Sequence, residues 1–145
     1  MRAIGGILAG LIVGLLVTIV IGVIGGIFFP VSAGSPGFSR PQQVVDAFAE
    51  MPQGLKIVLM LAWFGGTLAG AALAKRISGS GWVAWTVTGL IAAYVLANVL
   101  VLPMPGWMQA LSVAAPLLGG FIANHLVGGR IATVASATAP ERQQP

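Results

Sequence analysis

Four long stretches without Asp, Glu, Lys or Arg constrain the fold of this chain more than any other feature of its sequence. They cover residues 3–29, 57–74, 82–102 and 107–127. A helix of about 20 apolar residues crosses a bilayer core about 30 Å thick, and only helices or closed barrels pair their backbone groups within lipid. The stretches lack the period-two alternation of barrel strands. The sequence therefore predicts an all-α, polytopic membrane protein with a four-transmembrane-helix bundle.

Composition and the scarcity of reactive side chains narrow the function. Hydrophobic residues make up 57% of the 145-residue chain and charged residues 7%, against about 25% charged residues in soluble proteins. The chain has no cysteine and one histidine, which argues against thiol chemistry, iron–sulfur clusters and zinc sites. The four stretches contain no carboxylate for proton-coupled transport or acid–base catalysis. We therefore expect a protein without enzymatic activity, metal or cofactor.

The basic residues predict the orientation, because short cytoplasmic flanks of membrane helices are enriched in Lys and Arg. One side of the membrane receives five of these residues, namely Arg2, Lys75, Arg76, Arg130 and Arg142. The other side receives two, Arg40 and Lys56. The imbalance predicts both termini on the cytoplasmic side of a bacterial inner membrane. The net charge of +4 then attracts anionic membrane lipids, and the basic residues are too dispersed for a nucleic-acid partner.

The connections divide the chain into a transmembrane domain, residues 1–130, and a tail, residues 131–145. Residues 30–56 are the one long connection, which we expect to be periplasmic. Within it, Ser39 and Pro41 are typical of a helix start, and the sequence predicts a short periplasmic amphipathic helix. Its apolar face would consist of Val44, Val45, Phe48 and Met51. The tail has little apolar periodicity, so we expect it to be disordered and cytoplasmic.

Small residues recur every four positions along the first apolar stretch. This stripe consists of Gly6, Gly10, Gly14, Thr18, Gly22 and Gly26. Such stripes let two helix backbones approach closely, and the second stretch has the same spacing at Gly66 and Gly70. Shorter stripes in the other stretches are Gly89, Ala93 and Ala97, and Ala115, Gly119 and Ala123. Two interpretations remain: packing within one bundle, or contact of the first helix with a second copy or a partner membrane subunit.

Polar side chains inside the apolar stretches are the candidates for function. A polar path through the bundle would use Thr67, Thr88, Tyr94 and Asn98. Asn98 has a second interpretation, a hydrogen bond between helices. Trp63 is either a packing residue or the wall of a ligand cavity. At the cytoplasmic surface, the candidates for binding an anionic lipid headgroup are Lys75, Arg76, His125 and Arg130.

Three segments of the second half resemble a group of small four-span bacterial inner-membrane proteins of unassigned function. They are GGTLAGA at residues 65–71, Ala97-Asn98, and LPMPGW at residues 102–107. The resemblance covers residues 57–125. It implies the four-helix architecture and assigns no activity to any residue.

These features leave three hypotheses for function. The first is a non-enzymatic, self-associating accessory or scaffold protein, which the small-residue stripes and the lack of reactive groups favour. The second is a small channel or transporter for a neutral or anionic solute, lined by the polar residues. The third is a membrane protein that binds anionic lipid through its basic residues.

The predicted orientation is testable with reporter fusions at the C-terminus. Green fluorescent protein fused after Pro145 should fluoresce, because that protein folds on the cytoplasmic side. Alkaline phosphatase at the same position should be inactive, and active when fused within residues 30–56. An active phosphatase at the C-terminus would contradict the predicted topology.

Overall fold

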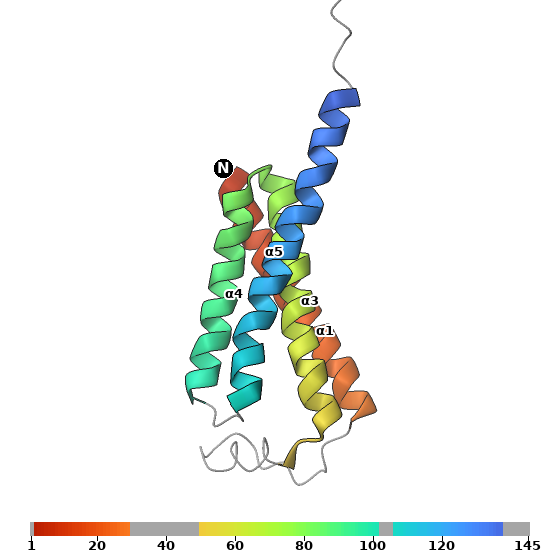
Figure 1. Cartoon of the computed structure of the whole chain (residues 1–145), viewed down its shortest axis with the longest axis vertical. Coiled ribbons are helices and arrows are strands. Elements are labelled where there is room, and N and C mark those ends of the chain that lie inside the picture. The colour runs from red at the N-terminus through yellow and green to blue at the C-terminus, as the bar shows by residue number, and fades with distance from the viewer. Residues whose placement is uncertain (1, 30–49, 102–105, 138–145) are drawn as a thin grey trace, which may run out of the picture.

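The computed structural model describes residues 2–29, 50–101 and 106–137. Within these ranges the chain forms four helices, α1 (Arg2–Phe28), α3 (Gln53–Ser78), α4 (Gly81–Val101) and α5 (Gly106–Ala137). Successive helices run in opposite directions and form a bundle (Figure 1). All four are long and apolar enough to cross a membrane. The predicted all-α fold with four candidate membrane spans is confirmed.

Local sequence explains the tight connection between α3 and α4. Gly79 follows the last residue of α3 with a positive φ of 69°, a conformation that glycine adopts without the steric penalty of a Cβ. Its backbone N–H donates to the carbonyl oxygen of Lys75 at 2.8 Å, which satisfies one of the free carbonyls at the helix end. The N-terminus of α1 lies at the same end of the bundle (Figure 1). We call this end, which carries Arg2, Lys75 and Arg76, the basic end.

Helix α3 lies at the centre of the bundle and α1 at its edge. Helix α3 contacts each of the other three helices, and 44% of its apolar span is buried, against 11% for α1. The exposed side chains of α1 are large and apolar, among them Leu8, Ile12, Leu15 and Leu16. Exposure of so much apolar surface to water is unfavourable. Helix α1 thus has the surface of a lipid-facing membrane span.

The core consists of three small clusters along α3. Towards the end opposite the basic end, the largest cluster contains Met60, Trp63, Val95, Val99 and Met108. The middle cluster contains Ala71, Ala84 and Ala123, and the third contains Ala74, Val83 and Val87. The alanines of the middle cluster let α3, α4 and α5 approach closely, because only methyl groups separate their backbones.

The contact between α1 and α3 is made by glycine backbone. A Cβ added to Gly10 would lie 2.7 Å from the carbonyl oxygen of Gly70, and one added to Gly70 would lie 2.5 Å from that of Gly10. Gly6 and Gly14 face the carbonyl oxygens of Ala74 and Gly66 in the same way, at 3.0 Å each. These separations leave no room for a side chain. The first half of the predicted stripe therefore packs within the chain.

The last two glycines of the stripe, Gly22 and Gly26, do not take part in this contact. Gly22 and Gly26 have no heavy atom within 4 Å of an added Cβ, whereas a Cβ at Gly25 would clash with the side chain of Val58. Each four-residue step exceeds the helical repeat of 3.6 residues and turns the stripe by about 40° around the helix. Gly25 follows Gly14 by about three whole turns, so it returns to the α3 side. Gly22 and Gly26 therefore do not pack within the described bundle, and the contact of this part of α1 with a second copy or a partner subunit stays a prediction.

Two predictions concern the ends of the chain. Helix α5 continues to Ala137 and extends past the other helices at the basic end (Figure 1). Residues 131–137 are therefore helical, whereas the sequence predicted a disordered tail there. These residues contain no glycine or proline, the residues that most disfavour a helix. Residues 39–49 of the predicted periplasmic amphipathic helix lie outside the described residues.

The glycine contact predicts opposite effects for the same substitution at two positions of the bundle. Gly70→Ala should lower the free energy of unfolding by about 1–3 kcal/mol, because its methyl group forces α1 away from α3. Gly22→Ala places its methyl group in open space and should leave stability unchanged or slightly higher. Unfolding in sodium dodecyl sulfate, followed by tryptophan fluorescence, measures both. Equal effects of the two substitutions would contradict the assigned interface.

Candidate functional site

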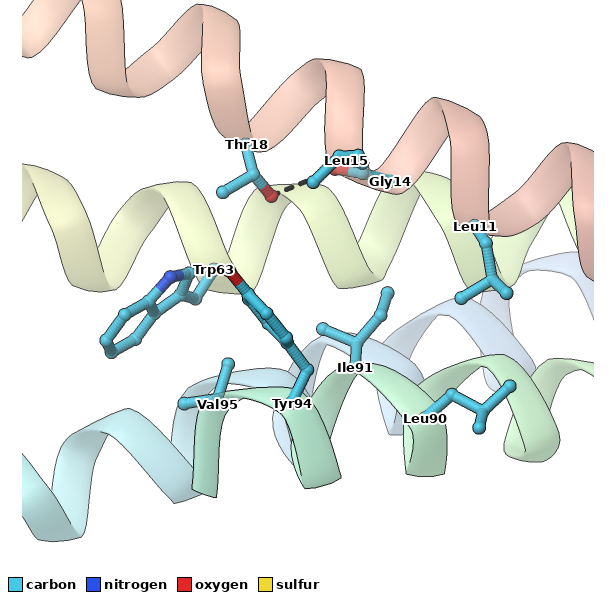
Figure 2. A pocket seen from close by; sticks show the side chains of 9 residues that line it. All are labelled: Leu11, Gly14, Leu15, Thr18, Trp63, Leu90, Ile91, Tyr94 and Val95. Atoms are coloured by element: carbon cyan, nitrogen blue, oxygen red, sulfur yellow. Dashed lines mark hydrogen bonds between the residues drawn. The ribbon is translucent and has the colours of Figure 1, made fainter. Parts of the chain in front are cut away.

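An apolar cleft lies between α1 and α4, with α3 behind it (Figure 2). Its volume is about 370 Å³. The lining residues are Leu11, Gly14, Leu15, Thr18, Trp63, Leu90, Ile91, Tyr94 and Val95. Gly10 and Gly14 hold α1 against α3 and lie beside Val87 and Ile91 of α4, and the cleft lies where α1 and α4 diverge from this contact (Figure 1). Among the features described, this cleft is the best candidate for binding an apolar group.

The polar groups of the cleft are few. The Thr18 hydroxyl donates to the carbonyl oxygen of Gly14 at 2.9 Å and also lies 3.3 Å from that of Ala62. Tyr94 extends from α4 across the cleft towards Trp63 of α3 (Figure 2). The described residues supply no hydrogen-bond partner for the Tyr94 hydroxyl. Trp63 is 9% exposed and belongs to the largest core cluster, so it is both a packing residue and a wall of the cleft.

The four residues predicted to line a polar path do not meet in this cleft. Of them, only Tyr94 lines it. Thr67 and Thr88 are buried, and an added Cβ at Gly120 of α5 would lie 2.1 Å from the Thr88 hydroxyl oxygen. The Asn98 amide donates to the carbonyl oxygen of Tyr94 in its own helix at 2.7 Å. The structure does not bring the four residues of the predicted path together, and the bond of Asn98 that it shows lies within α4.

Hydroxyl groups in the helices bond to their own backbone. Each donates to the carbonyl oxygen four residues earlier, and this holds for Thr18, Thr67, Ser78, Thr86, Thr88 and Ser112. Such bonds satisfy a buried hydroxyl without a partner on another helix. Two of these hydroxyls also reach α3: that of Thr18 lies 3.3 Å from the carbonyl oxygen of Ala62, and that of Ser112 donates to Sδ of Met60 at 3.4 Å.

The strongest polar link between helices joins Lys75 of α3 to Asn124 of α5. The Lys75 ammonium donates to the side-chain Oδ1 of Asn124 at 2.7 Å and also to its backbone carbonyl oxygen. Lys75 is 9% exposed, and its ammonium faces Asn124 rather than the surface, so this placement gives no support to the predicted contact of Lys75 with a lipid headgroup. A buried ammonium needs such acceptors, because desolvation of an unpaired charge is unfavourable. The sequence did not predict this link, although both residues lie near the ends of the apolar stretches 57–74 and 107–127 that face the same side of the predicted membrane.

The other predicted headgroup residues differ in their surroundings. Arg76 is exposed. The exposed His125 ring stacks on Phe121 of its own helix, with 4.5 Å between ring centroids. Arg130 lies on α5 beyond the side chains that the structure describes. The described part of the chain contains no group of three or more side chains suited to holding a metal ion.

The chain matches no family model, no curated protein and no solved structure with which it was compared. The resemblance to small four-span bacterial proteins therefore stays a prediction. The fold by itself defines an all-α protein with four candidate membrane spans.

The Lys75–Asn124 link predicts a contrast between two asparagines. Asn124→Leu removes a side-chain acceptor from a buried ammonium and should lower the free energy of unfolding by about 1.5–3 kcal/mol. Asn98→Leu, the same chemical change, removes only a bond to its own helix and should have a much smaller effect. Denaturant titrations of both variants measure the difference. The link would be refuted if the two variants were equally stable.

Proposed function

We propose that this chain is a non-enzymatic integral membrane protein of a bacterial inner membrane, with both termini in the cytoplasm. In this proposal it acts as an assembly or scaffold element by associating with a second copy of itself. The surface proposed for self-association is the small-residue face of α4, which consists of Gly89, Ala93 and Ala97. The observation that carries the proposal is that this face is exposed along its length.

The four helices use their small residues differently. Gly6, Gly10 and Gly14 of α1 are buried against α3, and Gly119 of α5 faces the backbone of α3 at Phe64. An added Cβ at Gly89, in contrast, would have no heavy atom within 4 Å. Because small residues promote close helix contacts in membranes, the α4 face is a surface available for another helix.

The cleft adds to the support for this surface. Leu90 and Tyr94 belong to the α4 side of the cleft, and both are exposed. They directly follow Gly89 and Ala93 in the chain, so a helix crossing the small-residue face also meets the edge of the cleft. Apolar side chains of that helix would fill the cleft, and its polar groups would meet the Tyr94 hydroxyl.

The channel hypothesis has less support. A path for a neutral or anionic solute needs polar groups directed at a common space. The described hydroxyls of Thr67 and Thr88 are instead buried between helices and bonded to their own backbones. The lipid hypothesis is supported by the exposed side chain of Arg76 at the basic end.

Self-association is testable by placing large side chains on the α4 face. The double variant Gly89→Leu, Ala93→Leu should raise the dissociation constant of the dimer about tenfold, equivalent to about 1.4 kcal/mol. The physical reason is that leucines hold the second helix away from the α4 backbone. Light scattering coupled to size exclusion in mild detergent, over a range of protein concentrations, measures the mass.

Gly5→Leu is the matched control, because Gly5 is equally free of neighbours and lies on α1. It should not change the dimer. Substitutions at Gly10 are unsuitable here, since they disturb the fold of the single chain. A wild-type chain that stays monomeric at all concentrations, or a double variant with unchanged mass, would contradict the proposal.

A further inference from the structure

A second apolar groove lies along the side of α3 that adjoins α5. Its volume is about 510 Å³. The lining residues are Gly65, Leu68, Ala69, Ala72 and Arg76 of α3, and Ala123, Leu126 and Val127 of α5. The lining is thus apolar except at Arg76, which lies at the basic end. An added Cβ at Gly65 would lie 3.0 Å from Cδ1 of Ile21, so the other end of the groove is close to α1.

The length of this groove matches one leaflet of a bilayer. Gly65 and Arg76 are eleven residues apart, a rise of about 16 Å along a helix. Half of a hydrocarbon core about 30 Å thick is about 15 Å. With Arg76 at the membrane surface, the groove therefore reaches about to the bilayer centre, which is the depth of one lipid acyl chain.

The charge at the end of the groove favours an anion. Arg76 is exposed, whereas the ammonium of the neighbouring Lys75 donates a hydrogen bond to Asn124. Glu50, the only acidic residue that the structure describes, precedes α3 at the opposite end of the bundle. No carboxylate among the described residues therefore neutralises the Arg76 guanidinium. A guanidinium binds phosphate through two parallel hydrogen bonds.

We propose that this groove binds an anionic phospholipid. One acyl chain lies along Gly65, Ala69 and Ala72, where small side chains leave the groove open. The lipid phosphate contacts the Arg76 guanidinium at the basic end. A free phosphate would leave the apolar groove unfilled, and a zwitterionic lipid would place a second cation close to Arg76. This site is on a different pair of helices from the α4 face, so it does not depend on self-association.

The site is testable by native mass spectrometry of the full chain in detergent with added phosphatidylglycerol. Arg76→Gln should weaken the binding of phosphatidylglycerol about fivefold to tenfold. Ala69→Phe fills the groove and should weaken the binding of phosphatidylglycerol and phosphatidylcholine alike. The wild-type chain should bind phosphatidylglycerol more tightly than phosphatidylcholine.

Arg2→Gln is the matched control for charge, because Arg2 is also exposed at the basic end but does not line the groove. An equal loss with Arg2→Gln would show general attraction to the basic end and overturn the site. Unchanged binding in Ala69→Phe, or equal affinity of the wild type for the two lipids, would overturn it as well. Should Ala69→Phe fail to fold, Ala69→Leu provides the same test with a smaller side chain.

Discussion

The close approach of two glycine backbones, Gly10 on α1 and Gly70 on α3, is the contact on which the arrangement of the other helices depends. Because the neighbouring carbonyl oxygens leave no space for a Cβ, α1 is held against α3 over the basic half of the bundle. Gly6 and Gly10 of α1 also lie beside Val83 and Val87 of α4, and the apolar cleft lies beyond this contact, where α1 and α4 diverge (Figure 1). The rest of α1 exposes large apolar side chains, for which lipid is the favourable surrounding.

Polar groups in this bundle are satisfied with little help from neighbouring helices. The hydroxyls of Thr67 and Thr88 donate to carbonyl oxygens one turn earlier in their own helices, and the same pattern recurs in each helix. Thr18 and Ser112 also reach acceptors on α3, and the Lys75 ammonium bonds to Asn124 of α5.

The two surfaces proposed for binding differ in chemistry. The α4 face and the adjoining cleft are apolar, with the Tyr94 hydroxyl as their exposed polar group. The groove between α3 and α5 is apolar along its length and cationic at Arg76. A protein partner at the first surface and an anionic lipid at the second would not compete, because the two surfaces lie on different helices.

The sequence by itself determined four helices that are long and apolar enough to cross a membrane, because a helix satisfies its backbone groups without water, and it predicted that small residues of α1 would pack closely. It identified Tyr94 and Arg76 as candidates that the structure places beside a cleft and in a groove. Only the tertiary structure decided that Gly25 rather than Gly22 meets α3, and that Lys75 rather than Arg76 turns inward. Successive residues are rotated by about 100° around a helix. Which of them face inward depends on how the whole helix is rotated about its axis, and the neighbouring helices set that rotation.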